Sequence, residues 1–119
     1  MKQILIVEDN QPIRDTLRMM LEMEGYAVTT ASNGREALDK LKEIERPCLI
    51  LLDLMMPAMN GWEFLEAQRA DIHIATIPVL VTSAGIEKDS ISSIAGFLKK
   101  PLEMDTLLAF VKRFCSPKA

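Results

Sequence analysis

A short run of branched apolar residues that ends in two acids opens the chain: ILIVED, residues 4–9. A similar run, CLILLD at residues 48–53, lies near the middle, and a third, PVLVTS, occupies residues 78–83. Continuous apolar runs of this length are typical of strands that are buried on both faces of a parallel sheet. The sequence therefore predicts strands at residues 4–7, 48–52 and 79–81, with weaker candidates at residues 27–30 and 97–99.

Helical patterns fill most of the segments between these runs. Apolar residues recur at three- and four-residue steps within residues 13–24, 37–44 and 107–114, which is the spacing of one buried helix face. A further helix is expected after Asn60 and a short one after Ala84. Strand and helix thus alternate five times, which predicts a single three-layer α/β domain with right-handed crossovers.

Two asparagines are expected to begin helices. Asn10 precedes Pro12, and Asn60 precedes Gly61 with Glu63 three positions after the asparagine. An asparagine side chain accepts a hydrogen bond from a free backbone N–H of the first turn, and an acid at the third helical position can bond back to the cap.

The composition limits the kind of protein. The 119 residues suit one domain, residues 1–119, and 49% of them are hydrophobic, enough for a sizeable core. The net charge is −3 and no basic run occurs, so direct nucleic-acid binding is not expected. No apolar run is long enough to insert into a membrane, and a cytoplasmic location is the default expectation.

Metal sites of the cysteine or histidine type are also disfavoured. The chain has 2 cysteines, without the paired spacing of a zinc site, and 1 histidine. Cys48 is expected to be an inert buried thiol in the middle strand. Cys115, near the end of the chain, is a candidate exposed thiol with no assigned use.

Polar residues follow four of the expected strands. In open parallel sheets, ligands bind at the carboxyl ends of the strands. The residues at those ends are Glu8 and Asp9, Asp53, Thr82 and Ser83, and Lys99 and Lys100. In a flavodoxin-like strand order the first and third strands are neighbours, so three carboxylates would converge there, repel one another and require a cation. An all-oxygen cluster favours a hard ion such as Mg²⁺.

This set of groups can handle a phosphoryl group. Mg²⁺ and Lys100 would neutralise charge on the phosphoryl oxygens, Ser83 would donate a hydrogen bond, and Asp53 would be the nucleophile. Any one of these acids alone would be better interpreted as a solvated residue at the start of a helix. Three of them, each at the end of a buried strand, favour a site.

Four motifs support a family resemblance: ILIVED at residues 4–9, DLMMPAMNG at 53–61, PVLVTSA at 78–84 and FLKKP at 97–101. With these motifs the chain resembles the receiver domain of bacterial two-component response regulators, and most of all the single-domain, chemotaxis-type members. The resemblance implies a flavodoxin-like (βα)5 fold, a doubly wound parallel sheet with strand order 2-1-3-4-5.

The resemblance also implies a role for each site residue. Asp53 would be the phosphoacceptor, Glu8 and Asp9 the acidic pair at Mg²⁺, and the backbone carbonyl of Met55 a further ligand. Lys100 would contact the phosphoryl group. The switch residues would be Ser83 and Phe97.

The implied protein is a signalling phosphoacceptor and not an enzyme in the ordinary sense. Its phosphoryl donor would be a sensor histidine kinase or a histidine phosphotransfer protein, and its output would go to a protein target that the sequence does not name. Between Ser83 and Lys100 the chain is shorter than the family pattern, which affects the fourth helix and the signalling face.

Other interpretations stay open. The chain could be a receiver-like binding module that does not depend on phosphorylation, or a receiver trimmed from a larger regulator. A phosphatase with an aspartyl-phosphate intermediate is disfavoured because Met55 stands where such enzymes place a second acid. A true flavodoxin is disfavoured because Glu8 and Asp9 would repel a flavin phosphate.

Overall fold

Five parallel strands form one sheet in the order β2-β1-β3-β4-β5 in the computed structural model, which describes residues 3–54, 59–83, 94–100 and 102–115. The strands are β1 Gln3–Val7, β2 Ala27–Ala31, β3 Leu49–Asp53, β4 Val79–Ser83 and β5 Gly96–Lys99. The helices are α1 Gln11–Met23, α2 Gly34–Glu43, α3 Gly61–Ala70 and α4 Met104–Cys115. This strand order confirms the predicted topology.

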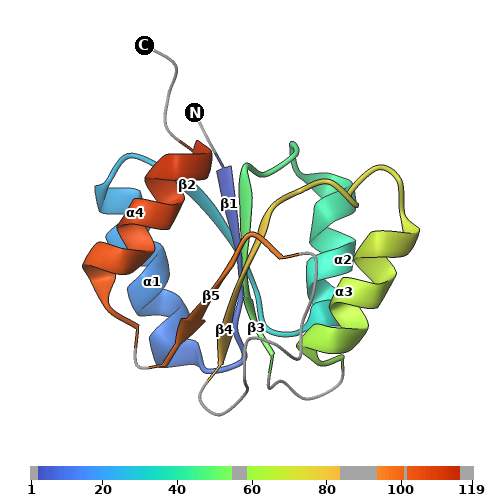
Figure 1. Cartoon of the computed structure of the whole chain (residues 1–119), viewed down its shortest axis with the longest axis horizontal. Helices are drawn as coiled ribbons and strands as arrows, with labels where there is room; N and C mark the ends of the chain where they lie inside the picture. Colours follow the sequence, from blue (N-terminus) through green and yellow to red (C-terminus); the bar gives the residue numbers. More distant parts are fainter. Residues whose placement is uncertain (1–2, 55–58, 84–93, 101, 116–119) are drawn as a thin grey trace.

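Helices cover both faces of the sheet (Figure 1). On one face, α1 and α4 pack over a group of buried residues that we call the α1–α4 cluster: Ile4, Ile6, Leu17, Leu21, Tyr26, Leu49, Leu51, Leu80, Leu98, Leu107, Val111 and Cys115. On the other face, α2 and α3 pack over the α2–α3 cluster: Leu5, Val7, Ala31, Ala37, Ile50, Leu52, Leu54, Phe64, Leu65, Ile77, Val79 and Val81. Successive strand residues alternate between the two clusters, as a pleated strand requires. The three-layer prediction is therefore confirmed.

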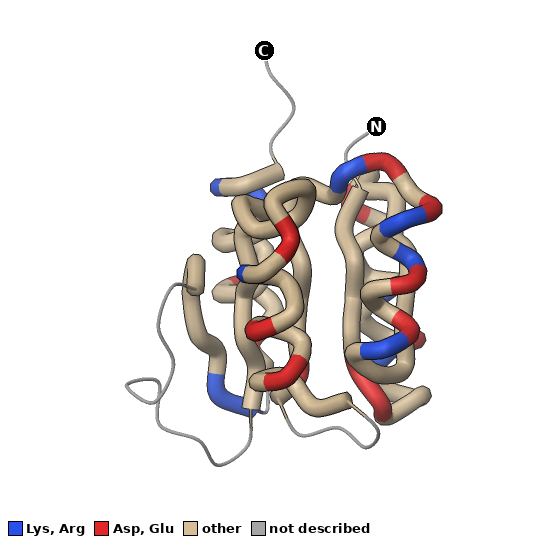
Figure 2. The backbone as a smooth tube through the Cα atoms, turned by 90° about the vertical axis from the view of Figure 1, so that its right-hand side faces the viewer, with Lys and Arg blue, Asp and Glu red and all other residues tan. Residues whose placement is uncertain are grey.

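The outer surfaces of the helices are charged. The sequence of α2, GREALDKLKE, mixes both signs, and Figure 2, which views the side covered by α2 and α3, shows acidic and basic residues interspersed along the helices. Such mixing is typical of a solvated helix face. None of the described helices is long and apolar enough to cross a membrane.

Asparagine caps begin the first three helices. The predicted caps Asn10 and Asn60 are confirmed: the side chain of Asn10 accepts a hydrogen bond from the N–H of Ile13, and Asn60 forms a reciprocal capping box with Glu63. Asn33, which the sequence analysis missed, caps α2 in the same way. Each cap satisfies an N–H that the helix itself leaves free.

A glycine sets the distance between α3 and the end of β3. The N–H of Gly61 donates to the carbonyl of Leu54 at 3.0 Å. A Cβ atom at Gly61 would lie 2.7 Å from the Cα of Leu54, closer than side chains pack. Glycine is therefore required for this close approach, one residue after Asp53.

The boundaries differ from the predictions by one or two residues. The middle strand begins at Leu49 rather than at Cys48, and β4 extends to Ser83. The short helix expected after Ala84, and with it most of the shortened segment, falls within residues 84–93, outside the described part of the chain.

The expectations for the two cysteines were wrong. Cys48 and Cys115 form a disulfide with a Cα–Cα distance of 5.4 Å, although 67 positions separate them in the sequence. Cys115 is fully buried, because it continues the stripe of Leu107 and Val111 at four-residue spacing on α4. Cys48 is half-buried and lies directly before β3 rather than within it.

Candidate functional site: an acidic cluster at the carboxyl ends of the strands

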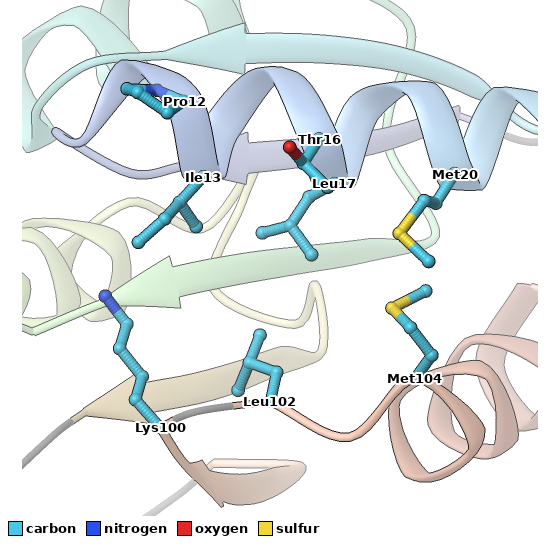
Figure 3. A pocket seen from close by; sticks show the side chains of 8 residues that line it. All are labelled: Pro12, Ile13, Thr16, Leu17, Met20, Lys100, Leu102 and Met104. Atoms are coloured by element: carbon cyan, nitrogen blue, oxygen red, sulfur yellow. The ribbon is translucent and has the colours of Figure 1, made fainter.

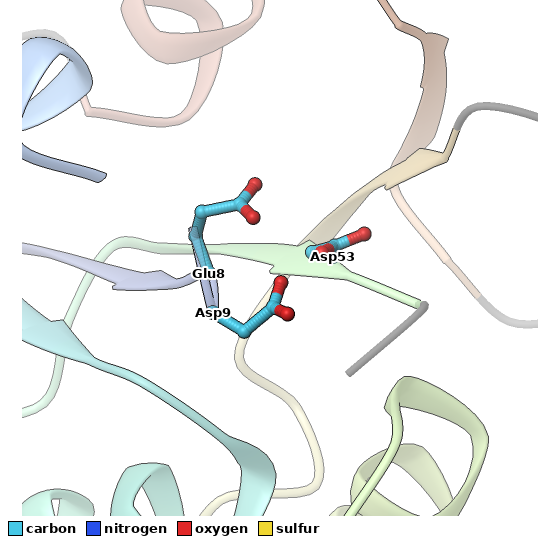
Figure 4. Close-up of side chains that lie close together, drawn as sticks. All are labelled: Glu8, Asp9 and Asp53. Carbon is cyan, nitrogen blue, oxygen red and sulfur yellow. The ribbon is translucent and has the colours of Figure 1, made fainter. Parts of the chain in front are cut away.

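Three carboxylates meet where β1 and β3 end (Figure 4). Glu8 and Asp9 follow β1 directly, and Asp53 is the last residue of β3. One carboxylate oxygen from each lies within 4.8 Å of the others. Glu8 and Asp53 are each 3% exposed, whereas Asp9 is exposed to solvent. The cluster therefore has a buried floor and an open rim.

A lysine that follows the edge strand β5 reaches this cluster. Lys100 directly follows β5, and its Nζ lies 2.9 Å from Oε1 of Glu8 and 3.5 Å from Oδ2 of Asp53. Partial burial on its own lowers the pKa of Lys100, but the hydrogen bond that Lys100 donates to Glu8 and the charges of Glu8 and Asp53 outweigh it, so the pKa is raised. The lysine is thus held as an ammonium between two buried acids.

The loop after β1 is fixed by its own hydrogen bonds. The second oxygen of the Glu8 carboxylate, Oε2, accepts the N–H of Asn10 at 3.2 Å. The guanidinium of Arg14 donates to the backbone carbonyl of Glu8 at 2.8 Å. Arg14 was not among the predicted site residues, although its place one helical turn after the cap Asn10 was an available signal.

Two neighbouring hydroxyl groups on β4 differ in their partners. The hydroxyl of Thr82 is directed at the carbonyl of Leu52, at 3.5 Å. The hydroxyl of Ser83 is fully buried and has no hydrogen-bond partner among the described residues. An unsatisfied buried hydroxyl is costly, so a ligand with acceptor oxygens would remove that cost. This difference favours Ser83 over Thr82 as the residue that meets a ligand.

Phe97 lies in a different environment from the charged residues. It is half-buried on β5, pairs with Val81 of β4, and packs against the α2–α3 cluster.

The backbone N–H of Lys100 donates to the carbonyl of Ser83 at 3.0 Å, so the ends of β4 and β5 are joined beside the cluster. The structure therefore brings Glu8, Asp9, Asp53 and Lys100 together in one cluster, whereas Met55 falls outside the described residues.

The donor set fits a divalent cation. The cluster offers carboxylate oxygens and no nitrogen or sulfur ligand among the described residues. Hard oxygen ligands suit Mg²⁺, which commonly keeps several waters and is held by one or two carboxylates. Asp9 and Asp53 are best placed to bind it, because both oxygens of Glu8 already accept hydrogen bonds.

An apolar groove of about 700 Å³ adjoins the cluster. Figure 3 shows Ile13 and Met20 of α1 on one wall, with Leu102 and Met104 facing them and Lys100 at one end. A partner that packs in this groove would come close to the acids.

Comparison with known proteins agrees with this arrangement. Residues 4–112 match the family model described as the response regulator receiver domain. The chain belongs to this family. This match confirms the predicted family. Receiver domains as a class are signalling phosphoacceptors of two-component systems and bind Mg²⁺ at an acidic pocket.

Individual relatives match this chain in sequence at moderate identity. The receiver domain is 37% identical over 115 residues to the response regulator MprA of Mycolicibacterium vanbaalenii, a match covering 90% of this chain and 47% of that protein. It is 38% identical to an uncharacterised 14.6 kDa protein of Leptolyngbya boryana, covering 94% of this chain and 88% of the relative. The chain thus spans about half the length of MprA.

Solved structures are similar over nearly the whole receiver domain. The chemotaxis protein CheY4 of Vibrio cholerae superposes with a TM-score of 0.87 at 33% identity, covering 96% of this chain and 98% of CheY4. The receiver domain of the sensor histidine kinase PA1611 of Pseudomonas aeruginosa gives a TM-score of 0.85 at 26% identity, covering 95% and 96%. That structure is described as having a magnesium ion coordinated in its active-site cleft.

Proposed function

We propose that this receiver domain accepts a phosphoryl group on Asp53 from a phosphohistidine of a partner protein, with Mg²⁺ bound at the acidic cluster. The observation that supports this most strongly is the ammonium of Lys100 held between Glu8 and Asp53. It puts a fixed positive charge beside a buried carboxylate nucleophile, which is what the transfer of a dianionic phosphoryl group requires.

The transfer step can be written with these residues. An oxygen of the Asp53 carboxylate forms the new P–O bond while the P–N bond to the donor imidazole breaks, and the imidazole leaves and takes up a proton. Mg²⁺, held by Asp9, Asp53 and the backbone carbonyl of Met55, would neutralise charge on the phosphoryl oxygens. Lys100 orients one of these oxygens.

Ser83 and Phe97 would carry the signal away from Asp53. The hydroxyl of Ser83 has no partner in the described structure and can donate to a phosphoryl oxygen. Ser83 pairs with Lys99 and Phe97 with Val81 on adjacent strands, so a shift of β4 is passed to β5. The result is a population shift between two surface conformations, which a downstream protein reads by docking.

The partner set follows the family. We propose that the donor is a sensor histidine kinase or a histidine phosphotransfer protein in the cytoplasm, and that residues 1–119 act as one receiver domain. The apolar groove beside Lys100 is a suitable place for the donor, because a helix packed there would present its phosphohistidine to the open rim of the cluster.

Phosphorylation by a small acyl phosphate tests the proposal. The wild-type protein incubated with acetyl phosphate and Mg²⁺ should gain the mass of one phosphoryl group, and Asp53→Asn should gain none. Asp39→Asn is the matched control, because it makes the same chemical change at an exposed residue of α2. Undiminished labelling of Asp53→Asn would refute the acceptor assignment.

The same experiment separates the alternatives. A phosphorylation-independent binding module would take up no phosphoryl group although it is folded and binds Mg²⁺. A phosphatase would hydrolyse phosphomonoesters over many turnovers, whereas a receiver domain releases phosphate only from its own Asp53.

A further inference from the structure

The disulfide joins two elements at the amino ends of the strands, on the opposite side of the molecule from the acidic cluster at their carboxyl ends. Cys48 directly precedes β3, and Cys115 is the last residue of α4. In Figure 1 the strands run toward the lower edge, and α4 ends at the upper edge near the starts of the strands. The Cα–Cα distance of 5.4 Å lies within the range that a disulfide spans without backbone movement.

The surroundings also suit the reduced form. The Sγ of Cys48 lies 3.3 Å from the carbonyl oxygen of Gln3, so a thiol at this position would have a hydrogen-bond acceptor. Cys115 lies in the apolar α1–α4 cluster, where a protonated thiol packs as a small hydrophobic group. Neither cysteine needs the bond in order to be accommodated by its neighbours.

The two sulfur atoms differ in accessibility. Cys48 is half-buried and Cys115 is fully buried. A reagent from solvent therefore reaches Cys48 first, and Cys115 is positioned to react next. An accessible cysteine that reacts first, beside a second cysteine that resolves the mixed disulfide, suits reversible thiol–disulfide exchange.

The elements that the bond connects both lead to the acidic cluster. β3 runs from Leu49, next to Cys48, to Asp53, and α4 begins at Met104, four positions after Lys100. The disulfide therefore connects the start of the strand that ends at the proposed phosphoacceptor to the end of the helix that begins soon after the lysine.

We propose that Cys48 and Cys115 form a redox-responsive site, in which a small-molecule disulfide of the glutathione class oxidises the pair and its thiol reduces it. The thiolate of Cys48 attacks the small disulfide, which forms a mixed disulfide and releases one thiolate. The thiolate of Cys115 then attacks the Cys48 sulfur and releases the second. The protein loses two hydrogens and the small disulfide gains them, as two thiols. Disulfides in a reducing cytoplasm are typically regulatory of this kind.

Thiol counting on the folded wild-type protein tests the site. The protein is equilibrated with oxidised or reduced glutathione and treated with an alkylating reagent under denaturing conditions. Mass spectrometry then gives the number of alkylated cysteines. We expect no alkylated cysteine after oxidation, two after reduction, and a peptide pair that links Cys48 to Cys115. Two alkylated cysteines in both samples, a lasting glutathione adduct on Cys48, or a disulfide between two copies would each overturn the proposal.

Thermal melting gives an independent readout. The oxidised protein should melt roughly 10 °C above the reduced protein, because closing a long loop restricts the unfolded chain. Cys48→Ser should melt at one temperature under both conditions while keeping a donor toward Gln3; Cys115→Ser is less informative, because it places a hydroxyl in an apolar cluster. Equal melting of wild-type protein in the two states would also overturn the proposal. Neither readout depends on phosphorylation. Asp53→Asn should give the same thiol counts as wild type and the same difference in melting temperature between its oxidised and reduced forms, whatever its own melting temperature.

Discussion

Nζ of Lys100 lies 2.9 Å from Oε1 of Glu8, and the glutamate is 3% exposed. The same ammonium also contacts Oδ2 of Asp53 at 3.5 Å. Lys100 therefore neutralises part of the charge of both carboxylates at the floor of the cluster.

Lys100→Met should destabilise the metal-free protein. The change leaves Glu8 and Asp53 buried without the ammonium, which typically costs about 1–3 kcal/mol. Urea unfolding with a chelator present measures the effect. Lys99→Met is the matched control, since Lys99 is the adjacent, exposed lysine, and a similar loss in that variant would contradict the assignment.

The advantage of wild type over Lys100→Met should disappear at high pH. The pKa of Lys100 is raised in the folded protein, so its stabilising effect is complete below the unfolded lysine pKa of about 10.4 and is lost as pH rises through the higher folded value. Urea midpoints of both proteins from pH 8 to 11 check this, with chelator throughout. A gap that stays constant across the series would mean that the ammonium charge is not responsible.

Mg²⁺ should raise the melting temperature of the unphosphorylated protein. A ligand that binds only the folded state at about 100 times its dissociation constant adds roughly 2.7 kcal/mol of stability. Asp9→Asn removes the exposed carboxylate of the rim and should abolish most of the Mg²⁺-dependent shift. Asp39→Asn, on the outer face of α2, should keep the full shift, and equal loss in both variants would place the ion elsewhere.

Ser83→Ala and Thr82→Val should have opposite consequences. The alanine removes a hydroxyl without a described partner, so the stability of the unphosphorylated protein should hold or rise, while labelling by acetyl phosphate should slow. The valine removes the contact with the Leu52 carbonyl and should cost about 1 kcal/mol with labelling unchanged. If the two labelling results were reversed, Thr82 would be the residue that meets the phosphoryl group.

The sequence carried most of the information on the sheet and the cluster. Runs such as residues 4–7 and 48–52 are apolar on both faces, which is typical of strands in a covered parallel sheet. Parallel strands end at the same side of a sheet, and the first and third strands are neighbours in a flavodoxin-like order. Glu8, Asp9 and Asp53 were therefore predicted to meet, as the structure shows.

The remaining details depend on contacts that the sequence does not encode locally. The pairing of Cys48 with Cys115 depends on how α4 lies across the sheet, and their separation of 67 positions gave no hint of it. Cys115 was wrongly predicted to be exposed because it lies near the chain end, although its four-residue spacing from Val111 and Leu107 was the signal that it is buried. The Thr82 hydroxyl has a hydrogen-bond partner and the Ser83 hydroxyl has none among the described residues, and this difference depends on one carbonyl, that of Leu52 on the neighbouring strand β3.

The contact between Glu8 and Lys100 joins residues that are 92 positions apart in the chain. During synthesis the acids of β1 and β3 leave the ribosome well before the lysine that neutralises them. Until that lysine is synthesised, Glu8 and Asp53 of the nascent chain lack the ammonium that contacts both of them in the folded protein, so this part of the site is completed late. A ribosome-bound chain that stops before β5 should therefore be more sensitive to proteases than the released protein, and added Mg²⁺ should reduce that difference.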